Sequence, residues 1–278
     1  MTDVRSTLTT QLVERGLERR EANWLIDEFA PGLDPDFFPV LDGAVVRRLA
    51  GEPLQYIIGH WPFRSLDLDV DPRVLIPRPE TEELVAHALL ALSRTNDVSP
   101  LIGDLGCGSG AIGLALLVEL AERGVAATLV GVDESQDALA VAKRNALKHA
   151  LSAASFVQSS WLSQVDESLR GRFSLIVANP PYVGSEEYRE LDPVLRYEPR
   201  GALVAEDAHD TPGLADLVEI ISTARAWLRP GAYLLCEHGY QQGDATRACA
   251  LAAGFLEVET VADMAGHPRF LVARNPAC

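Results

Sequence analysis

The sequence predicts an α/β protein with a doubly wound, mostly parallel sheet of seven strands, preceded by a small helical bundle and a β-hairpin connector. Three patterns lead to this prediction. Apolar residues recur with a helical period up to about residue 54, and the segment FRSLDLDVD at 63–71 alternates apolar and polar residues. After Pro79, strand-like and helix-like segments alternate, which is typical of a sheet with helices on both faces.

The first 60 residues are expected to form the helical bundle. Helical spacing runs through residues 8–29 to a break at Pro31-Gly32, and a second apolar stretch over 40–49 stops before Gly51. The alternating segment is typical of a hairpin, so residues 61–76 are expected to connect residues 1–60 to a second domain over 77–278. At roughly 100–200 residues per domain, the length of 278 suits one large domain and one small one.

The strands and helices of the second domain are predicted from its apolar runs. Helices are expected over 80–93, 111–123, 135–149, 212–228 and 241–253. Thr211-Pro212 fits a helix start and Gly254 fits the residue after a helix end. The last two strands are joined by only 263–268, too short for a crossover helix, so they are expected to pair antiparallel. The seven strand-like runs are LIGDL, TLVGVD, ASFVQ, FSLIVAN, AYLLCEH, FLEVETVA and FLVAR.

The chain is strongly acidic, with 24 basic and 40 acidic side chains and a net charge of −16. Residues 1–76 carry 8 basic and 13 acidic groups, so both parts of the chain are acidic. This balance counts against direct nucleic-acid binding, because phosphate-binding proteins present patches of Lys and Arg, and none is visible in the sequence. The hydrophobic content of 47% excludes a disordered acidic chain.

Neither a targeting segment nor a metal site is expected. The N-terminal residues lack the apolar core of a signal peptide, and no apolar stretch approaches the ~18 residues of a membrane span. The cysteines show neither zinc-site spacing nor a disulfide framework. We therefore expect a cytoplasmic protein without a membrane partner. The cysteines are Cys107, Cys236, Cys249 and Cys278.

A glycine-rich turn between a predicted strand and helix is the first candidate site. It runs from Asp104 and Leu105 through Gly106, Cys107, Gly108, Ser109 and Gly110. Glycines let a backbone approach a ligand closely, and the free N–H groups of the following helix can bind it. The spacing also satisfies the relaxed nicotinamide fingerprint, G-x-G-x-x-G/A, and such turns occur without a ligand.

Asp133 ends the next predicted strand, 27 residues after Gly106. A carboxylate there can accept hydrogen bonds from both hydroxyls of a ribose. The alternative is that Asp133 simply caps the helix that follows. Together with the glycine-rich turn, this residue leaves the identity of the ligand open.

The segment Asn179-Pro180-Pro181-Tyr182 decides between the ligands. It follows a run typical of a buried parallel strand, so we expect it at the carboxyl edge of the sheet, where open α/β folds bind ligands. The Asn179 side-chain oxygen and the Pro180 carbonyl can accept two N–H bonds from an amide or amino nitrogen, and Tyr182 can pack on the planar group. A loop with a capping Asn would explain the segment alone. With the glycine-rich turn upstream, it indicates S-adenosylmethionine and an N-methyltransferase.

Six segments spread over almost the whole chain share the order and spacing of one family: PLQYIIGHWPF (53–63), LIPRPETEELV (75–85), DLGCGSGAIGLAL (104–116), NPPYV (179–183), YEPRGALVAEDAHDTPGL (197–214) and EHGYQQGDATRACALAAGF (237–255). In these segments the sequence resembles the HemK/PrmC family, the glutamine N5-methyltransferases of peptide chain release factors. The glycine-rich turn and NPPY are shared with many methyltransferases, whereas IPRPETE and EPRGAL are much more particular.

The resemblance implies a class I S-adenosylmethionine-dependent methyltransferase with a Rossmann-like sheet and an antiparallel last strand. It implies that the glycine-rich turn wraps the methionine end of S-adenosyl-L-methionine, that Asp133 holds the ribose, and that Trp161 lies beside the adenine. Asn179 would also lie close to the cofactor, whose product is S-adenosyl-L-homocysteine. The chain departs from the family at Ser160, where relatives commonly have an acid that could bind the adenine amino group.

The resemblance also implies an acceptor and a partner. Asn179, Pro180, Pro181 and Tyr182 would bind the glutamine of the Gly-Gly-Gln motif of a class I release factor, with Asn179, Pro180 and Tyr182 as the catalytic residues. The helical bundle would dock that factor. Arg78 and residues 80–83 could border the acceptor, although a capped helix start explains them at least as well. The alternatives are a ribosomal-protein glutamine, the N6 of adenine in nucleic acid, and a non-catalytic cofactor-binding adaptor.

Overall fold

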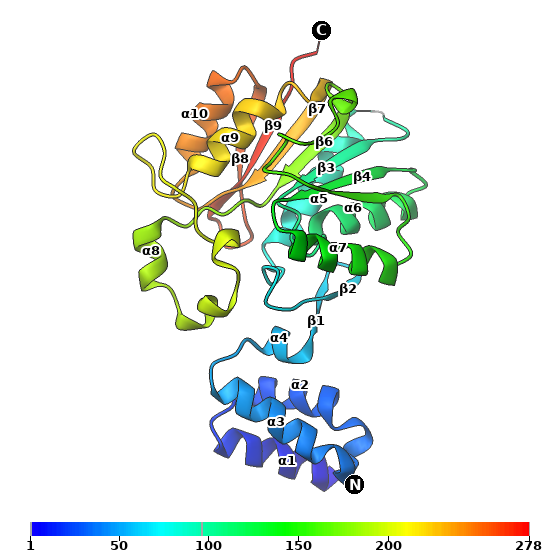
Figure 1. Cartoon of the computed structure of the whole chain (residues 1–278), viewed down its shortest axis with the longest axis vertical. Coiled ribbons are helices and arrows are strands. Elements are labelled where there is room, and N and C mark those ends of the chain that lie inside the picture. Colours follow the sequence, from blue (N-terminus) through cyan, green and yellow to red (C-terminus); the bar gives the residue numbers. More distant parts are fainter. Residues whose placement is uncertain (1, 96, 278) are drawn as a thin grey trace.

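The computed structural model describes residues 2–95 and 97–277, and it places a helical bundle at one end of a sheet covered by helices on both faces (Figure 1). The bundle consists of α1 (Thr2–Glu14), α2 (Arg19–Phe29), α3 (Phe38–Leu49) and α4 (Leu54–Ile58). Its apolar stripes meet in a core of their own, in which Leu25, Ile26 and Val45 are almost fully buried. The break predicted at Pro31-Gly32 is a 3₁₀ turn.

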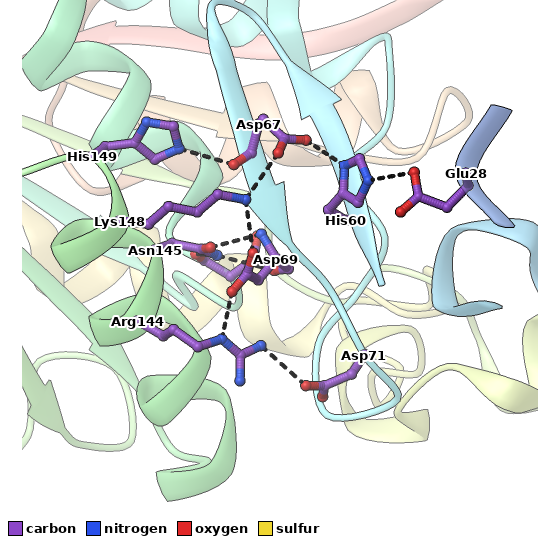
Figure 2. Close-up of polar contacts among 10 residues, drawn as sticks. Glu28, His60, Asp67, Asp69, Asp71, Arg144, Asn145, Lys148 and His149 are labelled. Carbon is purple, nitrogen blue, oxygen red and sulfur yellow. Dashed lines mark hydrogen bonds and ion pairs between the residues drawn. The ribbon is translucent and has the colours of Figure 1, made fainter. Parts of the chain in front are cut away.

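A two-stranded hairpin, β1 (His60–Phe63) and β2 (Leu66–Asp69), links the bundle to the sheet. The apolar–polar alternation has the predicted effect, since Leu66 and Leu68 are buried while Asp67 between them is exposed. Ion pairs fix the hairpin between the two parts of the chain (Figure 2). Lys148 Nζ lies 2.9 Å from Asp67 Oδ2 and 2.8 Å from Asp69 Oδ1, and His60 bridges Asp67 to Glu28 of the bundle.

The main sheet has seven strands in the order β5-β4-β3-β6-β7-β9-β8. Strands β3 to β7 pair in parallel, whereas β9 is antiparallel to both of its neighbours, which confirms the predicted antiparallel pairing of the last two strands. The strands are β3 (Leu101–Leu105), β4 (Thr128–Asp133), β5 (Ala154–Gln158), β6 (Phe173–Ala178), β7 (Leu228–Glu237), β8 (Leu256–Ala262) and β9 (Pro268–Arg274).

Helices cover both faces of this sheet. On one face α5, α6 and α7 share a core with Ile102 and Leu175, and on the other α9 and α10 share one with Leu105 and Ile176. Every residue of β6 is buried, as its continuous apolar run predicts for a central parallel strand. These helices are α5 (Thr81–Ser93), α6 (Ala111–Glu122), α7 (Gln136–Lys148), α9 (Ala215–Ala224) and α10 (Gly243–Ala252), and α8 (Ser185–Glu190) lies in the loop after β6.

The predicted helix start at Thr211-Pro212 is wrong. Helix α9 begins at Ala215, and Thr211 lies in a turn whose N–H donates to Ala208 O. Gly213 explains the difference, because its φ of +64° is incompatible with a helix and a Cβ there would lie 2.3 Å from Tyr182 O. The predicted helix also ran too far, since β7 already begins at Leu228. At α10 the prediction is confirmed, as Gly254 follows the helix with a φ of +86°.

Cys107, Cys236 and Cys249 are free thiols, and Cys278 lies outside the described residues. Within 2–95 and 97–277, His, Cys, Asp and Glu side chains do not gather in a group of three that could hold a metal ion. In the same ranges, none of the helices has the length and apolarity that crossing a membrane requires.

Candidate functional site

The parallel registers bring four strand ends together at the carboxyl edge of the sheet. Leu105 of β3 is opposite Val132 of β4 and Ala178 of β6, and Ala178 is opposite Cys236 of β7. The residues that come next, among them Gly106, Asp133 and Asn179, therefore lie side by side. The chain moves outward from β3 to β5 and then returns to β6 on the other side, so this edge is the switch point at which open α/β sheets bind ligands.

The glycine-rich turn leaves room for a ligand beside Trp161. Gly106, Gly108 and Gly110 all have positive φ angles. Gly106 has a φ of +69°, and a Cβ there would lie only 3.3 Å from the Trp161 ring, so glycine is the residue that best allows this ring to pack on the turn. Cys107 is buried beneath the turn, where burial raises the pKa of its thiol well above the usual value, so it is a packing residue and no nucleophile.

Asp133 does not cap the following helix. Ser135 does so, accepting a hydrogen bond from Ala138 N. The Asp133 carboxylate instead accepts one bond from Gly108 N and one from Ser135 N, both at 2.9 Å. Burial raises its pKa, while both hydrogen bonds lower it. The carboxylate is thus fixed beside the glycine-rich turn, where a ribose can reach it.

A cavity of about 330 Å³ lies in front of the turn. Ser109 and Gly110 of the turn, like Cys107, do not line it. The Ser109 carbonyl instead accepts a hydrogen bond from Asn145 on α7, so these residues hold the turn from behind. The predicted residues that line the cavity are Gly106, Gly108, Asp133, Trp161 and Asn179, together with Ser160 and Pro181.

The sequence assigned no separate role to Asp216 or to Asp104, which lies just before the glycines of the turn. Asp216, at the start of α9, lines the cavity. Burial raises the pKa of Asp216, and a hydrogen bond from Trp161 partly offsets this effect. Asp104 in β3 is fully buried, with Oδ2 accepting from Gly113 N at 2.9 Å and Oδ1 without a partner among the described residues. Burial raises the pKa of Asp104 to about 7. An acid inside the apolar run LIGDL is the signal that could have indicated Asp104.

The donor set fits a cationic nucleoside cofactor. Carboxylates suit the ammonium and sulfonium groups and the ribose hydroxyls of S-adenosylmethionine, and Trp161 suits its planar base. The glycine-rich turn provides the close backbone approach. The residues present are therefore compatible with this cofactor.

A second, larger cavity of about 900 Å³ adjoins the first. Asn179, Pro180, Pro181 and Tyr182 all line it, and Asn179 and Pro181 line both cavities. Asn179 therefore stands in the wall between the two. Within the described residues, no hydrogen-bond donor is paired with the Pro180 carbonyl.

The backbone after Pro181 is held by two neighbouring segments. Val183 N donates to Leu203 O, and Ala205 N donates to Val183 O, each at 3.0 Å. The buried Gln242 side chain donates to Tyr182 O at 3.0 Å and to Pro212 O at 2.7 Å. The NPPY segment is therefore a rigid part of the wall.

A buried hydrogen-bonded chain supports the NPPY side chains. Asn179 Nδ2 donates to Thr81 Oγ1 at 3.2 Å, Thr81 Oγ1 donates to Glu237 Oε2 at 2.7 Å, and the Tyr182 hydroxyl donates to Glu237 Oε1 at 3.3 Å. Burial raises the pKa of Glu237 to about 7, and it also raises that of Tyr182, which stays a neutral phenol. The sequence assigned no role to Thr81 or Glu237. For Glu237, its position as an acid at the end of the apolar run AYLLCE was a usable signal.

The two segments most particular to the resemblance contact each other. Arg78 Nη2 lies 2.6 Å from Glu198 Oε1, and Ile76 N donates to Glu198 Oε2 at 3.0 Å. Glu198 is buried, so IPRPETE and EPRGAL are joined by a largely desolvated ion pair. Arg78 also lines the larger cavity, which a helix start alone does not explain.

Comparisons with known proteins agree with this geometry. The family model "Methyltransferase small domain" matches residues 85–191. Among solved structures, a methyltransferase from Pyrococcus furiosus has a TM-score of 0.52 at 14% identity, covering 84% of this chain and 98% of that one. A 16S rRNA N2 G1207 methyltransferase from T. thermophilus, in complex with AdoMet and guanosine, also has a TM-score of 0.52, at 19% identity over 79% of this chain and 50% of that one. These two likenesses show the fold.

Curated relatives show more than the fold. The release factor glutamine methyltransferase of Salmonella typhimurium is 43% identical over 228 residues, which is 82% of this chain and 77% of the relative. That of Escherichia coli is 40% identical over 235 residues, 84% of this chain and 79% of the relative. The chain therefore belongs to the family of release factor glutamine methyltransferases and is an S-adenosylmethionine-dependent enzyme.

Proposed function

We propose that this enzyme methylates the side-chain amide nitrogen, N5, of the glutamine in the Gly-Gly-Gln motif of a class I peptide chain release factor. The observation that carries the proposal is the position of Asn179 in the wall between two cavities, one acidic and one lined by NPPY. The names of relatives that are 40–43% identical support the choice of acceptor.

The smaller cavity would hold the cofactor. Its methionine end would lie on the turn over 106–110, its ribose on Asp133 and its adenine beside Trp161. Cys107, Ser109 and Gly110 would act through the shape of the turn, because they do not line the cavity. When bound, S-adenosylmethionine supplies a methyl group from its sulfonium, which leaves as the neutral thioether S-adenosylhomocysteine, and the methylated amide nitrogen would release one of its two N–H protons to solvent.

The larger cavity would hold the acceptor amide. An amide nitrogen is a poor nucleophile because its lone pair is delocalised into the carbonyl. Asn179 Oδ1 and the Pro180 carbonyl would accept its two N–H bonds and stabilise the positive charge that develops on nitrogen, as an oxyanion hole does with reversed polarity. Tyr182 would pack on the amide plane, and alignment of this kind contributes up to ~7–11 kcal/mol in well-oriented reactions.

The helical bundle, residues 1–60, would dock the release factor. The bundle has its own core, and the hairpin holds it on the side of α7 through the ion pairs of Figure 2. The Tyr197 hydroxyl also donates to Ala50 O at 3.2 Å, which joins the bundle to the segment beside the larger cavity. A partner docked on the bundle would therefore meet the acceptor cavity at a fixed distance.

Labelled-methyl transfer tests the proposed acceptor. The enzyme is incubated with methyl-labelled S-adenosylmethionine and, separately, an intact class I release factor, the same factor with its Gly-Gly-Gln glutamine replaced by alanine, ribosomal proteins, and DNA. Label is expected on the intact factor only. Label on DNA or on a ribosomal protein, or equal label on the alanine-substituted factor, would contradict the proposed acceptor. Label on no macromolecule would favour an adaptor.

A further inference from the structure

The hydrogen-bonded chain behind Asn179 joins residues that are distant in sequence. Thr81 is the first residue of α5 and Glu237 is the last residue of β7, and both are buried. Neither lines either cavity. They contact Asn179 and Tyr182 from the protein side, so any influence on the reaction passes through those two residues.

We propose that Thr81 and Glu237 are positioning residues that fix the orientation of the Asn179 amide, so that its oxygen and not its NH₂ group faces the acceptor. This inference rests on the proposed function, because it assumes an acceptor nitrogen that carries N–H groups.

The direction of the hydrogen bonds carries the argument. When Glu237 is ionised, its carboxylate only accepts hydrogen bonds, so the Thr81 hydroxyl must donate its single hydrogen to Glu237 Oε2, 2.7 Å away. Thr81 Oγ1 can then only accept from Asn179, at 3.2 Å, and the Asn179 atom on that side must be the Nδ2 donor. Oδ1 is thereby directed away from Thr81. The Glu237 carboxylate, which reaches Asn179 through Thr81, therefore determines that the Asn179 oxygen is free to face the acceptor.

The orientation matters for the chemistry. A reversed Asn179 amide would present N–H groups to the N–H groups of the acceptor and would destabilise the positive charge that develops during transfer. It would also place Oδ1 against the lone pairs of Thr81. Free asparagine amides interconvert between the two orientations, so a fixed neighbour is needed to select one.

The surroundings of Glu237 support a role beyond packing. Its side chain is fully buried, and burying a carboxylate is costly unless it is well hydrogen-bonded. The other oxygen, Oε1, accepts a hydrogen bond from the Tyr182 hydroxyl. One carboxylate therefore holds both Thr81, which orients the Asn179 amide, and Tyr182, whose ring lines the larger cavity. The positive charge of Arg269 favours the ionised form of Glu237, and the negative charge of the nearby Glu80 opposes it.

Thr81→Val tests the inference, with Thr81→Ser as its matched control. Valine keeps the shape of threonine and removes the hydroxyl, while serine keeps the hydroxyl. Single-turnover methyl transfer to the release factor should fall at least ~10-fold in Thr81→Val, the equivalent of one lost hydrogen bond, and should be largely retained in Thr81→Ser. The affinity for S-adenosylhomocysteine should match that of the wild type in both.

Three outcomes would overturn the inference: an undiminished rate in Thr81→Val, an equal loss in Thr81→Ser, or a loss of rate that parallels a loss of cofactor affinity and thermal stability. A spectroscopic measurement tests the positioning role separately from the proposed acceptor, because it is made on the enzyme without any acceptor. In the wild type, nuclear Overhauser contacts should join the Asn179 NH₂ protons to Thr81, and Glu237→Gln should weaken them. Their absence in the wild type would refute the positioning role even if methyl transfer occurs.

Discussion

Replacing Asn145 by alanine tests how the hairpin and the glycine-rich turn support each other. Asn145 on α7 is fully buried, and Figure 2 shows its contacts with the hairpin. Its Oδ1 accepts from Asp69 N at 2.7 Å, and its Nδ2 donates to Asp69 O at 3.1 Å and to Ser109 O at 2.9 Å. One side chain therefore pairs with the outer edge of β2 and with the turn beside the candidate cofactor cavity.

The expected loss of stability follows from these contacts. Asn145→Ala leaves one backbone N–H and two carbonyl groups without a protein partner, and an unpaired buried group costs roughly 1–3 kcal/mol. Water reaches part of the Asp69 backbone, so we expect about 3 kcal/mol in total, a large part of the 5–15 kcal/mol typical of a folded domain. The affinity for S-adenosylhomocysteine should also fall, because the Ser109 carbonyl loses its anchor.

Urea unfolding measures the first effect and calorimetric titration the second. Leu147→Ala is the matched control on the same helix, because Leu147 is 82% exposed and should change stability by less than ~0.5 kcal/mol. Asn145→Asp keeps the acceptor for Asp69 N but sets a buried carboxylate against the Asp69 and Ser109 carbonyls, so it should be at least as destabilising as Asn145→Ala. A loss below ~1 kcal/mol in Asn145→Ala would mean that the three hydrogen bonds of Asn145 contribute little net stabilisation and that it does not anchor the hairpin and the turn.

The remaining predictions concern the cofactor carboxylate and the pH dependence. Asp133→Asn should lower the affinity for S-adenosylhomocysteine at least ~10-fold, because an amide cannot replace a charged acceptor that already holds Gly108 N and Ser135 N. Ser135→Ala keeps the N–H that binds Asp133 but removes the helix cap from a residue that also lines the cavity, so it should lower the melting temperature and reduce that affinity less than Asp133→Asn does. A larger loss of affinity in Ser135→Ala than in Asp133→Asn, measured by calorimetry, would contradict the assignment. The methyl-transfer rate should rise with pH through about 7, because burial raises the pKa of Glu237 to about 7 and only its ionised form compels Thr81 to donate. Glu80, Tyr182 and Arg269 also affect the pKa of Glu237, and the pKa of Asp104 is also about 7. The quantity to measure is therefore the part of the pH-dependent increase in rate that Glu237→Gln removes. A pH–rate profile that is the same in Glu237→Gln would exclude Glu237 as the source of the increase.

Most of the carboxyl edge could be predicted from the sequence, because its signals are local. The glycine-rich turn, Asp133 and NPPY each follow an apolar run, and parallel strands place their carboxyl ends at one edge of a sheet. The alternation in the hairpin and the short link before the last strand were equally local. These patterns depend on neighbours in the chain, which a sequence shows directly.

The supporting contacts could not be predicted in the same way. Thr81 and Glu237 lie 156 positions apart, and Asn145 reaches Asp69 across 76. Such pairs depend on how helices pack on the sheet, which apolar spacing does not specify. The wrong helix start at Thr211-Pro212 has a similar origin, since the turn at Gly213 is fixed by close packing against the Tyr182 carbonyl.

The rate of methyl transfer by Asn179→Ala shows whether this side chain acts on the acceptor from the wall between the two cavities. The rate is measured in a single turnover on an intact release factor, with the affinity for S-adenosylhomocysteine measured in parallel. Transfer should be abolished while the cofactor affinity is largely retained. Transfer at a rate near that of the wild type would contradict this role of Asn179.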